Sequence, residues 1–474
     1  MLTVSIDIGS TWTKGALLAH KGTDLAVRKR AVFPTTTSNL ADGFFHVLSN
    51  LVDRPDPAGA IRNKEIQLFY SSSAKGGLAV AALGLVPDIT LETAKLAAYS
   101  AGAKLTRVLS YRLTRQDIES LERTPPDILL FAGGTDGGNM DYVVANAEAL
   151  ARSSLNCSIV YAGNRAALDE VTALLGDRDF MAVDNVLPEI DAPNPDPARR
   201  AMRAIFLSKI VKGKGLDTII AQTGAEPLPT PFAVYEYAKC IRRHVPGWSD
   251  FILLDMGGAT TDVYSAHKES PEAGTVLRGL PEPVVKRTVE GDLGMRVSAA
   301  AAAESGKALI ESALDEAGYA WWDFADYVTR VTQEPNYLPA NDDIQGRRFD
   351  AILAGACIAH ACARHAGRSH EVYTPDGLVR VQIGRDLTGV SRVIGSGGWL
   401  SKAEGFNPQQ WFAAVGVDNR ERTVLLPERV EYWRDDDYLF PLLANVAQGY
   451  PEAAARAGIQ MLVRDEERMS YGTK

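Results

Sequence analysis

The 474-residue sequence lacks several features that mark specialised classes of protein. Its four cysteines, Cys157, Cys240, Cys357 and Cys362, are too widely scattered for a disulfide framework. No stretch approaches the roughly 18 apolar residues of a membrane-spanning helix, and the N-terminus has no basic and apolar segments of a secretory signal. We therefore expect a cytoplasmic protein that does not contact a membrane.

Acidic residues outnumber basic ones, with 59 Asp and Glu against 50 Lys and Arg. The net charge is −9, and no long run of lysine and arginine occurs. This balance argues against nucleic acid or an anionic membrane as the main partner. Because 474 residues exceed what one hydrophobic core usually supports, we expect at least two lobes.

Common signatures of nucleotide and metal sites are missing as well. The sequence has no P-loop, no Gly-x-Gly-x-x-Gly after its first strand, no His-Glu-x-x-His and no Gly-x-Ser-x-Gly. Cys357, His360, Cys362 and His365 share one predicted helix, which raises the alternative of a metal site. Since positions 357 and 362 face different sides of a helix, ordinary packing is the favoured interpretation.

Short apolar runs bounded by glycine or proline alternate with helical patterns, which indicates an α/β fold. Strands are predicted at 2–8, 15–20, 26–33, 66–70, 127–132, 158–162, 181–184, 251–256, 378–384 and 390–394. Helices are predicted at 139–153, 164–175, 199–213, 231–244, within 299–330, at 349–366 and from about 440 onward. Asn139 and Asn164 are predicted N-caps, and the proline-rich segment 188–198 is predicted to be a loop.

The most informative pattern is an internal repeat. The segment from Asp7 to Lys14 (DIGSTWTK) returns as the segment from Asp255 to Asp262 (DMGGATTD). Each copy is followed, in the same order, by an apolar run ending in paired glycines, at 128–134 and 392–398. Two matches in the same order predict two similar lobes that face each other.

The repeated segments have the chemistry of a phosphate site. Glycine lets the backbone approach a phosphate, and its N–H groups and nearby hydroxyls can bond the oxygens. The predicted phosphate-binding residues are Gly9, Ser10, Thr11, Thr13, Lys14, Gly257, Gly258, Thr260 and Thr261. Asp7 and Asp255 are the predicted magnesium ligands, through bound water. An ordinary hairpin turn would explain either segment alone, but the duplication favours a nucleotide site.

With these segments, the sequence resembles the actin, Hsp70 and sugar-kinase ATPase superfamily. Residues 6–14 and 254–262 resemble its two phosphate motifs. Its adenosine motif is matched by Gly395, Ser396, Gly397 and Gly398. The helices at 231–244 and 440–460 resemble its hinge helices. The resemblance implies an α/β fold of two actin-like (ribonuclease H-like) lobes around a cleft for Mg²⁺ and ATP/ADP.

The expected domain organisation follows from this resemblance. The first actin-like lobe would span 1–249, with an α/β insertion at about 156–230. The second lobe would span 250–430, and a helical segment at 431–474 would return to the hinge.

Within the superfamily, the sequence is most similar to the MutL/GlmL family of glutamate mutase accessory proteins. The segments that carry this similarity are 7–14, 132–139, 255–262 and 290–296. The family implies an ATP-dependent reactivating chaperone that exchanges the damaged cofactor of an adenosylcobalamin-dependent mutase. That mutase would be the partner, and a homodimer is left open.

The resemblance also suggests roles for carboxylates. Asp7, Asp255 and Asp262 are the catalytic candidates, and Glu290 joins the nucleotide-binding residues. The base that orients the attacking water is left open among Asp255, Asp262, Glu226 and Glu290.

Three other functions stay open at this stage. A small-molecule kinase of the acetate- or sugar-kinase type would need a substrate acid or base, for which Asp136 is a candidate. An ATP-dependent subunit of the hydantoinase/oxoprolinase kind shares the Asp-x-Gly-Gly-x-x-x-Asp pattern. A scaffold could also bind nucleotide without using it.

Overall fold

The computed structural model describes residues 2–21, 24–36, 38–73, 78–190, 192–210, 215–271, 274–375 and 377–464. The chain forms two compact units. Unit 1 comprises Met1–Glu236 and Gly279–Pro281, and unit 2 comprises Tyr237–Arg278 and Glu282–Lys474. The units thus divide at Glu236 rather than at the predicted residue 249, and the C-terminal helices belong to unit 2.

The first sheet of unit 1 contains the N-terminal strands. Its strands are β1 (Leu2–Ile8), β2 (Trp12–Lys21), β3 (Asp24–Pro34), β4 (Ile66–Ser72) and β10 (Leu228–Pro229), in the order β10-β4-β1-β2-β3. β1 is antiparallel to β2 and parallel to β4. Buried Val4 and Ile6 on β1 join the same core as Phe44 and Val47 on helix α1 (Leu40–Leu51). Apolar and polar residues alternate along β1, and all of them after Leu2 are buried, so β1 is a central strand with α1 packed on its apolar face.

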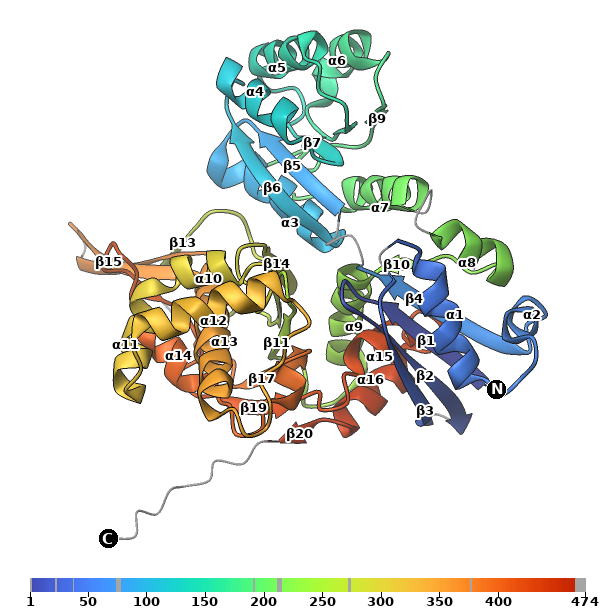
Figure 1. The fold of residues 1–474 in the computed structure, drawn as a ribbon. Helices are drawn as coiled ribbons and strands as arrows, with labels where there is room; N and C mark the ends of the chain where they lie inside the picture. Colours follow the sequence, from blue (N-terminus) through green and yellow to red (C-terminus); the bar gives the residue numbers. More distant parts are fainter. Residues whose placement is uncertain are drawn as a thin grey trace. The chain divides into compact units, whose positions relative to one another are not determined.

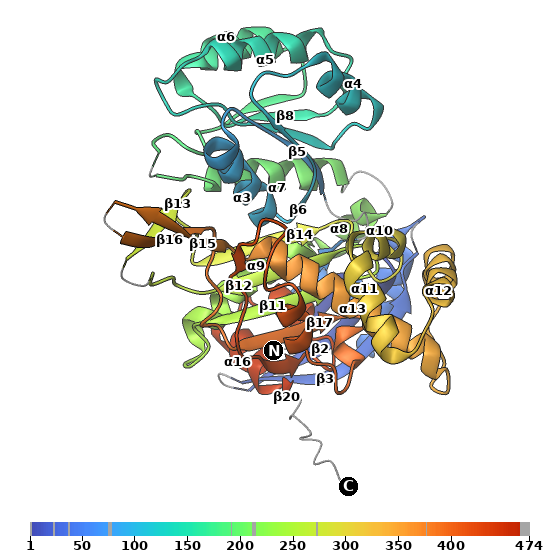
Figure 2. The ribbon, with the colours of Figure 1, turned by 90° about the vertical axis from the view of Figure 1, so that its left-hand side faces the viewer.

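Unit 1 also contains a wholly parallel sheet. Its strands are β5 (Leu78–Gly84), β6 (Ala103–Ser110), β7 (Ile128–Phe131), β8 (Ser158–Tyr161) and β9 (Phe180–Ala182), in the order β6-β5-β7-β8-β9. Figures 1 and 2 show helices α4 (Arg115–Arg123), α5 (Asp141–Arg152) and α6 (Leu168–Leu175) on one face, and α3 (Glu92–Ser100) and α7 (Asp196–Ile210) on the other. The inserted domain therefore begins near Leu78, well before the predicted residue 156.

The main sheet of unit 2 repeats the topology of the first sheet of unit 1. Its strands are β11 (Phe251–Met256), β12 (Thr261–Ala266), β14 (Val285–Glu290), β17 (Arg392–Gly397), β19 (Glu431–Arg434) and β20 (Val463–Arg464), in the order β14-β12-β11-β17-β19-β20. β11 is antiparallel to β12 and parallel to β17, as β1 is to β2 and β4. Buried Ile252 and Leu254 share a core with Leu353 and Ile358 of the long helix α13 (Ile344–His365).

The rest of unit 2 consists of helices and a small second sheet. The alanine-rich region at 299–330 forms three helices, α10 (Ala299–Ser305), α11 (Lys307–Ala317) and α12 (Trp321–Gln333). Gly306 and Gly318 separate these helices, and Gly318 has the left-handed φ of +75° that favours glycine at a helix end. The small sheet is formed by β13 (Thr275–Arg278), β15 (Arg368–Thr374), β16 (Gly377–Ile383) and β18 (Thr423–Val424).

The helices predicted at the hinge pack together through the part of the first one that lies in unit 2, which begins at Tyr237. They are α9 (Thr230–His244), α15 (Phe440–Val446) and α16 (Pro451–Gln460). The Tyr237 ring lies 5.4 Å from the Phe440 ring, centre to centre, and its hydroxyl donates to the Ala454 carbonyl at 2.8 Å. A side chain at Gly458 would collide with the Tyr237 hydroxyl, so this contact requires glycine. The second half of α9 thus belongs to the core of unit 2.

Most predicted elements are confirmed, and the differences are local. α7 begins at Asp196, inside the predicted loop 188–198. Asn164 accepts from the Ala166 N–H as a cap, whereas the N-cap of α5 is Met140 and not Asn139. The ends of two predicted helices, at 211–213 and 465–474, lie outside the described residues. No helix of the described chain is long and apolar enough to cross a membrane.

Candidate nucleotide site: two glycine hairpins

The first repeated segment is a tight hairpin between β1 and β2. The Gly9 N–H donates to the Trp12 carbonyl at 3.1 Å and closes the turn. This closure places Asp7 opposite Lys14 in the ladder. Ser10 is exposed at the tip, and Lys14 is half-buried on β2.

The second repeated segment forms the same hairpin between β11 and β12. The Gly257 N–H donates to the Thr260 carbonyl at 2.9 Å. Asp255 lies opposite Asp262, and Met256 lies opposite Thr261. The turn bond and the register therefore fall at equivalent positions in the two copies of the repeat.

In both turns, the backbone carbonyl groups accept hydrogen bonds from a segment elsewhere in the same unit. In the first hairpin, the Thr35 hydroxyl donates to the Gly9 carbonyl at 2.9 Å, and the Thr35 N–H donates to the Thr11 carbonyl at 2.9 Å. In the second, the carbonyls of Gly257, Gly258 and Ala259 accept from the Met295 N–H, the Arg296 N–H and the Ser298 hydroxyl. In each unit the donors follow the third strand of the sheet, β3 or β14.

The N–H groups at the turn tips are left available. Within the described ranges, the N–H groups of Ser10 and Thr11 have no protein acceptor, and neither do those of Gly258 and Ala259. Successive N–H groups of this kind bind anionic oxygens. Each hairpin can therefore present donors to a phosphate group.

Thr13 and Thr261, predicted to bind phosphate, have hydrogen-bonding partners within the protein instead. Both side chains are fully buried. The Thr13 hydroxyl lies 3.0 Å from the Thr35 hydroxyl, and the Thr261 hydroxyl donates to the Leu293 carbonyl at 2.7 Å. These equivalent threonines join each hairpin to the segment behind it. Thr260 and Thr11 are half-buried on the turns themselves.

Asp7 is placed beneath the first hairpin rather than on its surface. Its side chain is only 1% exposed. One carboxylate oxygen accepts from the Ser71 hydroxyl at 2.9 Å and from the Thr230 hydroxyl at 2.6 Å. These bonds connect β1 to β4 and to the start of α9. The geometry favours a structural role for Asp7 over direct metal binding.

The two carboxylates of the second hairpin have different surroundings. Asp262 is buried and accepts from the Arg287 Nε at 2.8 Å. Although burial disfavours the charged guanidinium, the Asp262 carboxylate holds the pKa of Arg287 above its ordinary value. This ion pair makes Asp262 a poor candidate for a base. Asp255, by contrast, is half-buried at the carboxyl end of β11, and it is the stronger candidate for a magnesium ligand.

Glu290 lies at the end of β14, directly opposite Thr261 in the ladder. Its carboxylate accepts from Arg364 at 2.7 Å, and Arg364 also makes two bonds to Asp292, at 2.7 and 2.8 Å. Burial raises the pKa of Glu290, and the hydrogen bond from Arg364 lowers the pKa of Asp292. The structure thus holds Glu290 beside the second hairpin, whereas the fourth candidate base, Glu226, is exposed in unit 1.

The predicted adenosine motif is shaped mainly by packing. A side chain at Gly397 would meet the Met256 carbonyl at 2.1 Å, and one at Gly395 would meet the Tyr432 hydroxyl at 1.9 Å. Ser396 is buried, and its hydroxyl donates to Asp435 at 2.8 Å. Gly398 alone of the four is exposed and has open space around it. The glycines therefore let β17 lie close to the second hairpin.

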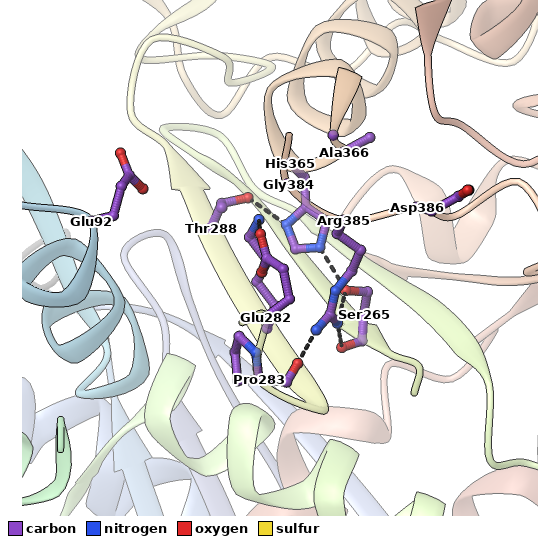
Figure 3. Close-up of polar contacts among 12 residues, drawn as sticks. Glu92, Ser265, Glu282, Pro283, Thr288, His365, Ala366, Gly384, Arg385 and Asp386 are labelled. Atoms are coloured by element: carbon purple, nitrogen blue, oxygen red, sulfur yellow. Dashed lines mark hydrogen bonds and ion pairs between the residues drawn. The ribbon is translucent and has the colours of Figure 1, made fainter. Parts of the chain in front are cut away.

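A buried polar network joins β12 and β14 to the end of α13 (Figure 3). The His365 ring, at the end of α13, lies 2.7 Å from the Ser265 hydroxyl on β12 and 2.8 Å from the Thr288 hydroxyl on β14. Arg385 donates to the Ser265 hydroxyl at 2.8 Å and also to the Pro283 carbonyl. Burial lowers the pKa of His365 well below its ordinary value. The network therefore contains a neutral histidine.

Sequence reasoning missed the residues behind the hairpins. Thr35, Ser298 and the buried Arg296–Asp350 ion pair belong to no motif of catalysis or binding. Of these residues, only Arg296 lies in a segment, 290–296, that carried the family resemblance. The Cys357 and Cys362 side chains are buried in the core of unit 2. In the described part of the chain, no group of three His, Cys, Asp or Glu side chains is arranged to hold a metal.

Two sheets of the same topology, each with a glycine hairpin between its first two strands, define a protein of the actin-like class. The family model described as "MutL protein" matches residues 3–462. Protein MutL of Clostridium tetanomorphum is 34% identical, over 97% of this chain and 98% of the relative. The chain belongs to the MutL family.

Solved structures of low identity give weaker matches. The nucleotide-free diol dehydratase-reactivating factor is 11% identical over 95% of this chain and 99% of its own, with a TM-score of 0.35. The activator of 2-hydroxyisocaproyl-CoA dehydratase from Clostridium difficile, with bound ADPNP, is 10% identical over 96% of both chains, with a TM-score of 0.28.

Proposed function

We propose that the chain is an ATP-dependent reactivating chaperone for an adenosylcobalamin-dependent aminomutase. It would use ATP binding and hydrolysis to drive the exchange of damaged cofactor. The observation that carries the proposal is the pair of equivalently built hairpins, one in each unit, in a chain of the MutL family. ATP/ADP and Mg²⁺ are the proposed cofactors, and the mutase is the proposed partner.

The hairpins would bind the phosphate groups through their tips. The free N–H groups of Ser10 and Thr11 in unit 1, and those of Gly258 and Ala259 in unit 2, suit phosphate oxygens in the described structure. Because their carbonyls are bonded from behind, these turns need little rearrangement when an anion binds. The phosphoanhydride of bound ATP would supply the free energy for the cycle.

The carboxylates of unit 2 would have separate roles. Asp255 would bind Mg²⁺ through water, consistent with its half-buried place beside the hairpin. Glu290 would orient the attacking water, because it lies opposite Thr261 and burial raises its pKa despite the bond from Arg364, whereas Asp262 bonds the fully buried Arg287. Removing the Asp255 carboxylate should lower hydrolysis by weakening Mg²⁺ binding. Removing the Glu290 carboxylate should lower it by leaving the attacking water unoriented.

Coupling to the partner would follow from differential binding. A ligand shifts a conformational equilibrium only by its difference in affinity for the two states. If the mutase binds the ATP state and the ADP state unequally, each turnover can loosen its grip on damaged cofactor. No transfer of phosphate to a metabolite is needed.

The test measures Mg-ATP hydrolysis and recovery of a cobalamin aminomutase that has been inactivated with cyanocobalamin. We expect slow hydrolysis, faster hydrolysis with the mutase, and recovery of mutase activity when ATP and adenosylcobalamin are both added. Asp255→Asn should reduce hydrolysis by about 100-fold, as loss of a metal-binding or charge-stabilising group commonly does. Asp250→Asn, just before β11, is the matched control and should keep its activity.

Other outcomes would decide against the proposal. Stoichiometric phosphorylation of a small metabolite would establish a kinase instead. Unchanged hydrolysis by Asp255→Asn would remove the second hairpin from the site. Hydrolysis without any effect on an inactivated mutase would leave an ATPase with a different partner.

A further inference from the structure

The parallel sheet of unit 1 has a feature that the hairpins do not explain. From β5 the chain crosses to β6 on one side, and β7 then lies on the other side of β5. This is a topological switch point. In open parallel sheets, ligands bind outside the carboxyl ends of the strands at such a point.

The loops after the adjacent strands meet at this switch point. Gly134, in the loop that follows β7, lies against Leu85, which follows β5, since a Cβ there would be 3.7 Å from the Leu85 side chain. The N–H of Tyr111, which follows β6, donates to the Gly84 carbonyl at 3.1 Å. Segments after three neighbouring strands therefore form one continuous surface.

The glycine-rich loop Gly133–Asn139 is rigidly held from below. Asn164 is fully buried; its side chain accepts from the Gly137 N–H at 2.9 Å and donates to the Gly138 carbonyl at 2.9 Å. Asn185, also buried, donates to the Gly134 carbonyl at 3.0 Å and to the Asp136 carboxylate at 3.0 Å. Gly134 and Gly137 have φ angles of +68° and +74°, which only glycine adopts readily. The loop is preorganised.

The exposed side of this loop supplies donors and positive charge. Among the described contacts, the Gly134 N–H and the Thr135 N–H and hydroxyl have no acceptor. Arg165 follows β8, and its backbone N–H bonds the Asp136 carboxylate at 2.8 Å. Its exposed guanidinium has no ion-pair partner in the described part of the chain, and the same holds for Arg112 after β6. These groups suit a phosphate.

Exposed aromatic side chains border the same surface. Tyr111 is 57% exposed and has a φ of +63°, which is rare for a residue other than glycine. Its carbonyl accepts from the fully buried Asn146 of α5 at 2.8 Å, so the strained position is held in place. Tyr142, 49% exposed, precedes Asn146 by four residues and lies on the same face of α5. Tyr111 is thus linked to α5 through Asn146, and Tyr142 lies in the first turn of α5, three residues after the glycine-rich loop.

We propose that this switch-point surface (Tyr111, Gly134, Thr135, Tyr142 and Arg165) is a second ligand site. It binds a small molecule with a planar heteroaromatic ring and a phosphate group, of the mononucleotide class. The tyrosines contact the ring, and Gly134, Thr135 and Arg165 bind the phosphate. This inference does not depend on the proposed function of the hairpins.

The test uses the full-length protein with FMN, riboflavin and AMP as probes. FMN fluorescence should be quenched saturably, with one equivalent bound, and riboflavin, which lacks the phosphate, should bind at least about tenfold more weakly. AMP should displace FMN if the site accepts purine nucleotides. Asp255→Asn should bind FMN as the wild-type chain does, which separates this site from the hairpins.

Two variants distinguish the ring from the phosphate. Arg165→Gln should weaken FMN about tenfold and leave riboflavin unchanged. Tyr111→Asn, which tolerates the left-handed backbone, should weaken both probes. Arg152→Gln, at the other end of α5, and Tyr373→Asn, in unit 2, are the matched controls. Should Tyr111→Asn fail to fold, Arg165→Gln still decides, because that side chain is exposed.

The proposal is overturned if neither FMN nor AMP binds saturably up to about 1 mM, the weak end of specific affinity. It is also overturned if Arg165→Gln binds FMN as the wild-type chain does. Binding of AMP without FMN supports the site and identifies a nucleotide as its occupant. If FMN binds and AMP does not, the site is supported, and its ligand has a ring system larger than a purine.

Discussion

The two hairpins of this protein share a turn but are supported in different ways. Behind the first, a single residue, Thr35, bonds the turn carbonyls. Behind the second, a segment that ends at Ser298 does so, and it is anchored by the buried ion pair between Arg296 and Asp350. The same local geometry is thus obtained from hydroxyls in unit 1 and from buried charge in unit 2.

This difference has consequences for stability. A buried ion pair gives little net stabilisation, yet it is costly to break, because the remaining charge loses its partner in a region of low dielectric. A hydroxyl bond contributes less and costs less to remove. The second hairpin should therefore be more sensitive than the first to mutation and to pH.

The largest effect should come from Asp350→Ala. It removes two 2.9 Å bonds from Arg296 and one 2.7 Å bond from the Tyr327 hydroxyl, and it leaves Arg296 buried without its carboxylate. We expect a loss of about 3–5 kcal/mol in the free energy of unfolding of unit 2. Urea unfolding followed by tryptophan fluorescence measures it, because every tryptophan except Trp12 belongs to unit 2.

The control for this variant is Glu119→Gln, which breaks the exposed Arg115–Glu119 pair on α4. It should change stability by less than about 1 kcal/mol. A loss below about 1 kcal/mol in Asp350→Ala would show that the ion pair does not support the second hairpin.

Gly397→Ala should have the next largest effect. Gly397 has a φ of +102°, and a Cβ would lie 2.1 Å from the Met256 carbonyl at the base of the second hairpin. Strain and displacement together should cost about 2–4 kcal/mol. Gly398→Ala is the matched control, since nothing lies within 4 Å of its Cβ position. Equal unfolding midpoints of the two variants would contradict the packing role assigned to Gly397.

His365→Gln tests the pH dependence of unit 2. The pKa of His365 is lowered in the folded state by burial, so the unfolded chain binds a proton that the folded chain does not. This contribution to stability is present above the unfolded pKa of about 6.5 and is lost as the pH falls below it, by up to about 1.4 kcal/mol per pH unit. Urea midpoints at pH 7.5, 6.5 and 5.5 should fall less steeply for the variant. Identical slopes would mean that His365 is protonated in the fold.

Thr35→Val should have the smallest effect and should act on the first hairpin. It removes the hydroxyl that donates to the Gly9 carbonyl and contacts the Thr13 hydroxyl. We expect a loss of about 1 kcal/mol, seen as faster amide exchange at residues 9–13 with unit 2 unchanged. The control is Thr218→Val, on the exposed side of α8 (Leu216–Thr223). Exchange that accelerates equally in both units would contradict separate support of the hairpins.

Much of the fold could be predicted because its signals are local. β1 and β11 have the predicted bounds, since the alternating apolar residues of β1 and the apolar run of β11, each next to a glycine turn, indicate buried strands. β5 and β6 were missed because the alanine-rich sequence of β5 and the mixed sequence of β6 have weak strand propensity. Their strand conformation depends on parallel neighbours that are distant in sequence.

The candidate site divides in the same way. The repeat from Asp7 to Lys14 and from Asp255 to Asp262 determined by itself where both hairpins form, because a turn and its register depend on adjacent residues. Only the tertiary structure decided which side chains of the motif form hydrogen bonds to other parts of the protein. Thr13, Asp7 and Asp262 match the motif, yet their partners Thr35, Ser71 and Arg287 come from other strands or from the segment after one. Such pairings arise from long-range packing, which no local pattern of residues specifies.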